Sequence, residues 1–286
     1  MRISRSVHIL LAAFTYLLGA GIANYLGLPF RADAFWLGLL AMCLAQLGMN
    51  LLAEVFRPVN EPILPEQTPS ERELLRSNAL YLSIAALAAL ALVIFVLYRA
   101  SRLSATPFLL VACSVFVVLL RSVPPLRLLE RGFGEFLLAV HLAYIIPAIA
   151  FVLQAQDYHR LLGFVTAPLT AIALAYCIAM DFPAFAADQK YERRTLLTVL
   201  GWQRAIPFHH ALLAAAYLLL AAAPLFGLSL RVLWPAFISL PFALLQIGLL
   251  RNIAAGLPPN WRLLRANALA VFGLTAYFLT VSFWLR

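Results

Sequence analysis

The sequence predicts an all-α polytopic membrane protein, a single integral domain of residues 1–286 with nine transmembrane helices. Hydrophobic residues make up 64% of the chain and charged residues only 12%, against the ~25% charged residues typical of soluble domains. Apolar runs long enough to cross a hydrocarbon core of ~30 Å recur along the whole chain. The net charge of +9 comes from cations between these runs. That pattern is typical of a membrane topology signal and argues against a nucleic-acid partner.

Nine apolar runs define the predicted spans. The first follows a short basic N-terminus but has no small-residue cleavage site after it, so we expect it to stay as a helix. The fourth is short, and Pro107 lies near its start, where a helix tolerates proline. The predicted spans are residues 7–30, 34–56, 79–98, 106–120, 135–154, 162–184, 208–228, 232–250 and 263–285.

The distribution of Lys and Arg predicts the orientation of these spans. Fifteen of these cations fall on the side of the membrane that holds the N-terminus, and six fall on the opposite side. The positive-inside rule then places the N-terminus in the cytoplasm and the C-terminus outside, in a plasma or inner cell membrane.

Two of the longer connections share a pattern. Loops 57–78 and 185–207 lie four spans apart on the predicted cytoplasmic side, and each follows a helix end with acids and cations. This spacing is consistent with two four-helix halves, related by an internal duplication, plus a ninth helix. The acidic stretch 66–73 also contains a capping signal, Thr68-Pro-Ser-Glu71, which predicts a helix start and a short surface helix over the site.

A first polar cluster lies at the end of the second span. Asn50, Glu54 and Arg57 fall near one helix face, and Glu61 follows one turn later. These residues are candidates for a ligand site. The alternative, a helix end whose polar groups meet lipid headgroups, has about equal weight for this cluster alone.

A second polar cluster lies at the end of the sixth span. Asp181 and Asp188 are seven residues apart, so a continuous helix would put them on one face. Lys190, Arg193 and Arg194 follow at once. Mg²⁺ prefers few carboxylates and completes its shell with phosphate oxygens and water, while cations bind phosphate directly. The mixture predicts a site for a Mg²⁺-diphosphate, and an ion-paired surface loop is the alternative.

A third cluster connects the fourth and fifth spans. Its double proline and its glycines predict a tight return. Arg127 could face the same ligand from a second side, although alone this segment reads as a topogenic turn.

In this order the three clusters resemble the motifs of the UbiA-type membrane prenyltransferases, and the resemblance covers most of the chain. That family has nine transmembrane helices, an Asp-rich motif after the second, another after the sixth, and a Pro-Pro segment between them. Ser122-Val-Pro-Pro-Leu-Arg127 and Gly132-Phe-Gly-Glu135 match the middle segment. The second motif is matched by Asp181, Asp188, Lys190, Arg194, Thr195, Leu196 and Gly201.

The sequence also departs from these motifs. Arg121 stands where tyrosine is usual, and Ala184 replaces the middle Asp of the second motif. In the first motif Arg57 occupies an Asp position and Ala53 an Asn or Asp position. One register puts Arg57 on the central Asp, between acids at positions 54 and 61. Another puts it on the last, by matching 59–62 to an Ile-Asn-Glu-Pro run, and both registers stay open.

The resemblance implies transfer of an isoprenoid group, within the membrane, from a prenyl diphosphate to a membrane-soluble aromatic, tetrapyrrole or lipid acceptor. Mg²⁺ would assist, with a reduced or lost requirement as the alternative. No catalytic residue is assigned, and neither an oligomeric state nor the acceptor can be read from the sequence. The implied diphosphate ligands are Arg57, Arg127, Lys190, Arg193 and Arg194, and the implied metal ligands are Asp181, Asp188, Glu54, Glu61 and Asn50.

Because Arg57 combines a lost acid with a gained cation, we expect it to replace one Mg²⁺ and to contact the diphosphate itself. Two other classes of function remain as alternatives. One is a catalytically impaired relative that binds or carries an isoprenoid lipid. The other is a small-molecule transporter, which fits the helix count but not the clustering of polar motifs at one membrane face.

Overall fold

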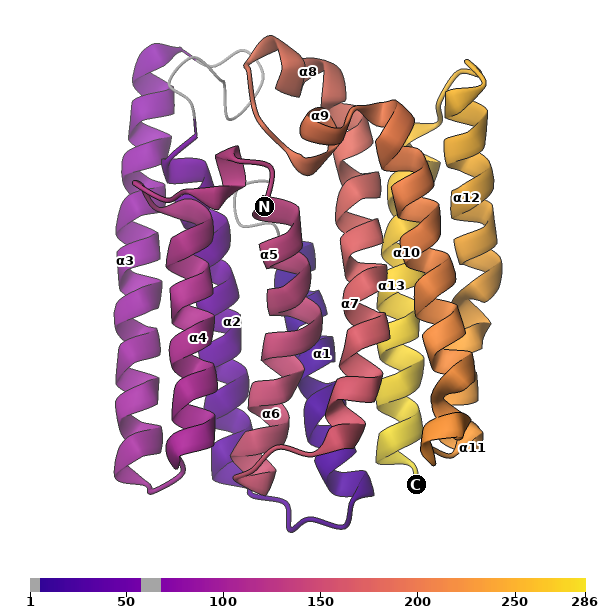
Figure 1. The fold of residues 1–286 in the computed structure, drawn as a ribbon. Coiled ribbons are helices and arrows are strands. Elements are labelled where there is room, and N and C mark those ends of the chain that lie inside the picture. The colour runs from indigo at the N-terminus through magenta and orange to yellow at the C-terminus, as the bar shows by residue number, and fades with distance from the viewer. Residues whose placement is uncertain (1–5, 58–67) are drawn as a thin grey trace.

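The computed structural model describes residues 6–57 and 68–286, and every regular element in these ranges is helical. Figure 1 shows a bundle of long helices that run roughly parallel to one another. Two short helices, α8 (Phe185–Lys190) and α9 (Leu196–Leu200), lie at one end of this bundle, which we call the α8/α9 end. Among the described residues, nine helices are long and apolar enough to cross a membrane.

The N-terminal part supplies the first five of these spans. They are formed by α1 (Ser6–Tyr25), α2 (Ala32–Val55), α3 (Pro69–Arg99), α4 (Ala105–Ser122), and a composite helix of α5 (Gly134–Val140), the π-helical turn His141–Ile145 and α6 (Ile146–Ala155). A single 3-10 turn, Leu128–Glu130, lies between α4 and α5.

The C-terminal part supplies the other four. They are formed by α7 (Arg160–Asp181), which continues through the 3-10 turn Phe182–Ala184 into α8; α10 (Trp202–Ala222) with the 3-10 turn Ala223–Phe226; α11 (Leu230–Leu233), the 3-10 turn Trp234–Ser239 and α12 (Leu240–Ala254); and α13 (Trp261–Trp284).

The predicted all-α fold with nine spans is confirmed, but several boundaries are wrong. The third helix begins at Pro69 rather than 79, because Thr68 and Glu71 form a capping box: the Thr68 hydroxyl accepts from the Glu71 N–H at 3.3 Å, and the Thr68 N–H donates to Glu71 Oε2 at 2.9 Å. The predicted capping signal therefore opens the third span itself and not a separate surface helix. The seventh span begins at Trp202 rather than 208, directly after Gly201 with its positive φ of 71°.

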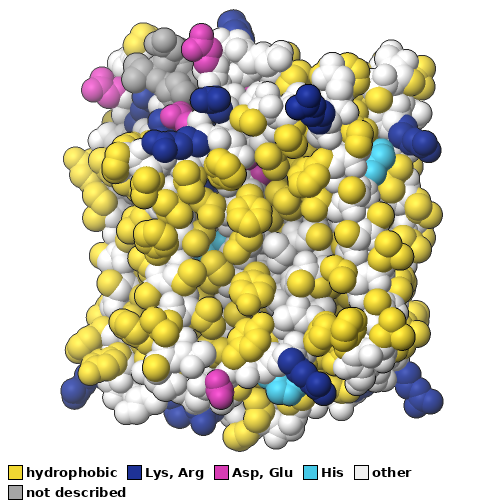
Figure 2. All heavy atoms as spheres, viewed as in Figure 1, with side chains coloured by type: hydrophobic (Ala, Val, Ile, Leu, Met, Phe, Trp, Pro, Cys, Tyr) yellow, Lys and Arg dark blue, Asp and Glu magenta, His cyan; other side chains and the backbone are white. Residues whose placement is uncertain are grey.

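The surface follows the pattern expected for a protein surrounded by lipid. In Figure 2 hydrophobic side chains cover the middle of the visible face, while Lys, Arg, Asp and Glu gather at its two ends. An apolar belt between two charged rims suits a hydrocarbon core between two layers of headgroups.

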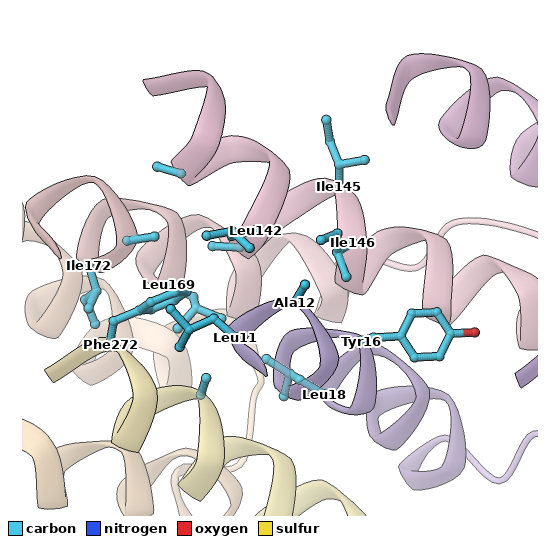
Figure 3. Packing of buried hydrophobic residues seen from close by; sticks show 14 of the residues in the cluster. Leu11, Ala12, Tyr16, Leu18, Leu142, Ile145, Ile146, Leu169, Ile172 and Phe272 are labelled. Carbon is cyan, nitrogen blue, oxygen red and sulfur yellow. The ribbon is translucent and has the colours of Figure 1, made fainter. Parts of the chain in front are cut away.

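The helices differ in how deeply they lie within the bundle. Of the most apolar window of each span, 83% is buried for Gly134–Ala155 and 72% for Arg160–Lys190, against 28% for Pro69–Arg99. The α5–α6 helix and α7 are therefore central and α3 is peripheral. Figure 3 shows side chains of α1, α6, α7 and α13, among them Leu11, Ile146, Leu169 and Phe272, gathered in one buried cluster.

A polar side chain sits inside this apolar centre, at the π-helical turn. His141 is fully buried; one ring nitrogen lies 2.9 Å from Ser114 Oγ and the other 3.1 Å from Gln46 Oε1. Pro147 follows in the next turn and has no N–H to donate to the α-helical hydrogen-bond pattern. The wider π-helical turn thus lies directly before the position at which one backbone hydrogen bond is missing. The two hydrogen bonds tie the central helix to α2 and α4.

The helices α1 and α6 approach each other closely at Gly19 and Pro147. A Cβ atom added at Gly19 would overlap the backbone carbonyl of Pro147, so only glycine fits at this position. Small residues of this kind let helices pack closely in a membrane, where the hydrophobic effect does not drive helix association.

We therefore expect Gly19→Ala to destabilise the fold by about 1–3 kcal/mol, since the added methyl group forces the two backbones apart. Thermal unfolding in detergent checks this. Gly248→Ala in α12 is the matched control, because a Cβ there meets nothing within 4 Å and alanine favours a helix over glycine. Equal melting temperatures for the two variants would contradict the close crossing.

Candidate functional site

A cavity of about 630 Å³ opens near the α8/α9 end of the bundle. It combines charged residues with apolar and aromatic ones. Its walls come from α1, α4, α5, α7, α8 and α13, and from the chain just after α2, the two neighbouring 3-10 turns and the connection between α8 and α9. The lining residues are Ser6, Val7, His8, Arg57, Arg121, Leu129, Glu135, Leu138, Tyr176, Cys177, Met180, Asp181, Ala184, Asp188, Arg193, Thr195 and Arg265.

The two aspartates of the second polar cluster both line this cavity. Asp181 ends α7, and the 3-10 turn at Pro183 then carries the chain into α8, where Asp188 is buried with 3% exposure. The predicted helix end at residue 184 is thus wrong, because the helical path continues to Lys190 with only a local tightening. The i, i+7 spacing nevertheless brings both carboxylates to one cavity.

Asp181 is the more exceptional of the two. Its Oδ2 is buried and has no hydrogen-bond partner among the residues that the structure describes. The charged groups that act on it are Glu135, Asp188 and Arg193. A buried carboxylate oxygen without a partner is costly, so this atom is the clearest candidate in the cavity for contact with a cation or a donor.

Asp188 is tied to Arg193 twice. The Arg193 N–H donates to the Asp188 carbonyl at 2.8 Å, and Arg193 Nη1 donates to Asp188 Oδ1 at 3.4 Å. These contacts close the turn between α8 and α9 and place the guanidinium of Arg193 against the cavity.

The first polar cluster divides between the cavity and the protein interior. Arg57 lines the cavity, and its Nε lies 3.2 Å from Oε2 of the buried Glu54. Asn50 instead belongs to the interior network: its Oδ1 accepts from Gln46 Nε2 at 2.9 Å and lies 3.4 Å from His8 Nδ1. Neither Glu54 nor Asn50 is among the cavity-lining residues, so Arg57 is the one member of this cluster, among those the structure describes, that reaches the cavity wall.

The other predicted ligands lie away from the cavity wall. Lys190 and Arg194 are exposed, and Lys190 Nζ lies 5.5 Å from the centre of the Tyr191 ring. Arg127 Nη2 forms a 2.6 Å ion pair with Glu130; burial lowers the pKa of Arg127, while the nearby Glu130 carboxylate acts in the opposite direction. Glu61 lies outside the described residues. The ligand roles given to these residues stay predictions.

The structure adds cavity residues that sequence reasoning did not propose as ligands: Arg121, Glu135, His8, Tyr176 and Arg265. Arg121 and Glu135 belong to the segment that resembles the family motif, which was a usable signal. Arg265 opens the ninth span among other basic residues and gave no signal of its own. His8 and Tyr176 lie within apolar runs, where lone polar residues most often only pack.

Glu135 connects α5 to the start of α9, beside the cavity. Its Oε2 accepts the N–H of Leu196 at 3.0 Å, at the first residue of α9, and the neighbouring Thr195 hydroxyl accepts from the Thr198 N–H at 3.2 Å. A carboxylate at this position satisfies one of the unpaired N–H groups of a helix start.

The acids of the cavity suit one Mg²⁺ better than two. The described residues contain no group of three or more His, Cys, Asp or Glu that could hold a metal ion. The unpartnered oxygen of Asp181, with Asp188 beside it, fits an ion that takes one or two carboxylates and completes its shell with phosphate oxygens and water. Ala53, Arg57 and Ala184 leave the described part of the site without the acids for a second ion.

The fold matches solved structures of UbiA homologues over nearly the whole chain. A UbiA homologue from Archaeoglobus fulgidus bound to GPP and Mg²⁺ superposes with a TM-score of 0.63 at 17% identity, covering 100% of this chain and 99% of that one. An apo UbiA homologue from Aeropyrum pernix K1 gives a TM-score of 0.57 at 14% identity, with 96% and 98% covered. The protein therefore has the UbiA fold.

A structure of digeranylgeranylglyceryl phosphate synthase is similar as well, with a TM-score of 0.59 at 12% identity and coverage of 99% and 95%. No family model matches the sequence. No curated protein matches it either. The likeness is one of fold.

We expect Glu135→Ala to destabilise the start of α9, because the Leu196 N–H loses its acceptor. Leaving a buried N–H without an acceptor typically costs about 1–3 kcal/mol. Hydrogen exchange of the protein in detergent should become faster for residues 193–198. Glu130→Ala is the control, since it removes another carboxylate of the same segment, one that pairs with Arg127. Unchanged exchange in Glu135→Ala would contradict this role.

Proposed function

We propose that the protein binds a prenyl diphosphate in this cavity and transfers its isoprenoid group to a membrane-soluble acceptor. The observation that carries the proposal is the convergence of Asp181, Asp188, Arg193 and Arg57 on one cavity at the end of an otherwise apolar bundle. Such a site offers ligands for both a metal ion and phosphate oxygens. The bundle around it is apolar enough for an isoprenoid tail.

The similar structures support this assignment. UbiA homologues from Archaeoglobus fulgidus have been solved with GPP and Mg²⁺ and with DMAPP and Mg²⁺. A third structure of the same fold concerns the synthase of a glyceryl phosphate lipid. We carry the ligand class, a prenyl diphosphate, to this chain because its own cavity holds the charges that such a ligand needs.

Different cavity residues would serve phosphate binding, metal binding and the exclusion of water. Guanidinium groups bind phosphate oxygens in a planar, bidentate manner, so Arg57 and Arg193 would hold the diphosphate and stabilise the charge that it gains as it leaves. Asp181 and Asp188 would hold one Mg²⁺, which neutralises the leaving group when bound. The apolar wall around Leu138 and Met180 would exclude water, which protects the allylic cation until the acceptor attacks it.

A second candidate function is binding or carriage of an isoprenoid diphosphate without transfer. It is favoured by one observation: among the described residues no cluster of three acids is arranged for a metal ion. A site of this kind would retain the ligand while lacking the metal-assisted loss of diphosphate.

One experiment separates the two. Purified protein in nanodiscs is incubated with geranyl diphosphate or dimethylallyl diphosphate and with aromatic, tetrapyrrole and lipid acceptors, with and without Mg²⁺. Binding and diphosphate release are both measured. A transferase binds the prenyl diphosphate and releases diphosphate when an acceptor is present. Binding without release under any condition supports carriage, and no binding at all overturns both.

Asp181→Asn is the informative variant in this assay. It should reduce the Mg²⁺-dependent part of binding or release by about tenfold or more, since it replaces the carboxylate whose buried Oδ2 has no hydrogen-bond partner in the described part of the chain with a neutral amide. Asp157→Asn is the matched control, because Asp157 is exposed in the loop between α6 and α7, at the end of the bundle opposite α8 and α9 (Figure 1). Equal behaviour of the two variants would remove Asp181 from the site.

We also propose that the cavity faces the cytoplasm, as the fifteen-to-six distribution of cations predicts. The exposed residues Gln189, at the α8/α9 end, and Asp157, between α6 and α7, provide the test. In a background without the three native cysteines, a membrane-impermeant maleimide added to intact cells should label Asp157→Cys and spare Gln189→Cys. The reverse pattern would invert the topology.

A further inference from the structure

We propose that four arginines, Arg57, Arg121, Arg193 and Arg265, bind the diphosphate directly, so that binding does not require Mg²⁺. This inference rests on the proposed function and describes how the same cavity recognises its ligand. It assigns to arginine most of the anion binding that a pair of metal ions would otherwise provide.

The first support is the convergence of these residues. They come from four separate parts of the chain: the end of α2, the last turn of α4, the segment between α8 and α9, and the first turns of α13. All four line the one cavity. A run of neighbouring cations is usually a solvated surface, whereas cations brought together by four distant segments form a site that the fold assembles.

The second support is the balance of charge. The cavity has four guanidinium groups against three carboxylates, those of Glu135, Asp181 and Asp188. Asp188 already pairs with Arg193, and Glu135 accepts from the Leu196 N–H. Arg57 pairs with Glu54, which is buried and does not line the cavity. The lining residues themselves thus carry one more cation than acid, and they favour an anion over a second cation. A diphosphate supplies several negative oxygens within the reach of such a set.

Arg121 gives the third support. Its side chain is only 3% exposed, and its Nε donates to the carbonyl of Gly134 at 3.0 Å. This hydrogen bond fixes the plane of a group that stays charged at any ordinary pH. Ionisable residues at this depth of a membrane-spanning helix usually serve a functional site, and Arg121 lines the cavity in which an anionic ligand would lie.

The sequence pattern agrees with the geometry. Arg57 and Arg121 are the two positions at which the chain departs toward arginine from the motif pattern described above, where aspartate and tyrosine are usual. They lie 64 residues apart in the sequence, yet the fold brings both to the same cavity. The loss of an acid and the gain of two cations both weaken the binding of metal ions at the site and strengthen the binding of anions.

The test compares the dissociation constant of geranyl diphosphate for the purified protein in nanodiscs with EDTA and with Mg²⁺. We expect the two constants to differ by less than about tenfold. Inorganic diphosphate should compete in EDTA, and geraniol should not, which shows that the phosphate groups are recognised. Binding that appears only with Mg²⁺ overturns this inference and leaves the proposed function standing. No binding of a prenyl diphosphate in either condition overturns the proposed function itself.

Arg265→Gln and Arg262→Gln form a matched pair for the same measurement. Both residues are exposed near the start of α13, but only Arg265 lines the cavity. Arg265→Gln should weaken binding in EDTA by about tenfold or more, because a charge-assisted hydrogen bond is lost, while Arg262→Gln should leave it unchanged. Equal affinities for the two variants would exclude Arg265 from the site.

Arg57→Asp tests the exchange of cation for acid directly. It removes a guanidinium and adds a carboxylate, so binding in EDTA should fall by about tenfold or more, while the gain in affinity on adding Mg²⁺ should increase. A variant that binds equally well in EDTA and gains nothing from Mg²⁺ would contradict the role of Arg57. Thermal unfolding of each variant shows whether the fold is retained.

Discussion

Most features of this protein depend on one constraint: in an apolar bundle a polar or charged group must be satisfied within the protein or lie at a membrane face. The interior obeys it with hydrogen-bonded groups such as His141, which meets Ser114 and Gln46, and Tyr217, whose hydroxyl lies 2.7 Å from Ser239 Oγ. On the face shown in Figure 2 charged side chains gather at the two ends. The cavity is the place where acids and cations enter the bundle together.

The same constraint explains how much the sequence could predict. The number and order of spans follow from the length of apolar runs, because lipid imposes that length from outside the protein. Helix ends are less well defined, because local signals compete with hydropathy. At the third span the capping box at Thr68 extends the helix into a polar stretch. At the sixth span a 3-10 turn accommodates Pro183, so the helical path continues to Lys190.

The candidate site was predictable in part, for a geometric reason. Spacing along one helix places Asp181 and Asp188 on the same side, so their shared cavity could be foreseen. Spacing along a helix does not predict which neighbouring helix or cavity each side chain contacts. Asn50 shares a face with Glu54 and Arg57, yet its side-chain oxygen contacts Gln46 and His8 within the bundle. Arg265 reaches the cavity through tertiary packing, which no local pattern encodes.

The two contacts between Asp188 and Arg193 have a consequence for how the cavity would bind ions of opposite charge. The carboxylate and an incoming phosphate compete for the same guanidinium. An anion that draws Arg193 toward itself therefore leaves Asp188 more available to a cation. The affinities for anion and cation are then linked, and by thermodynamic reciprocity each raises the other by the same factor. In such a site each ion would prepare the place for the other, whichever binds first.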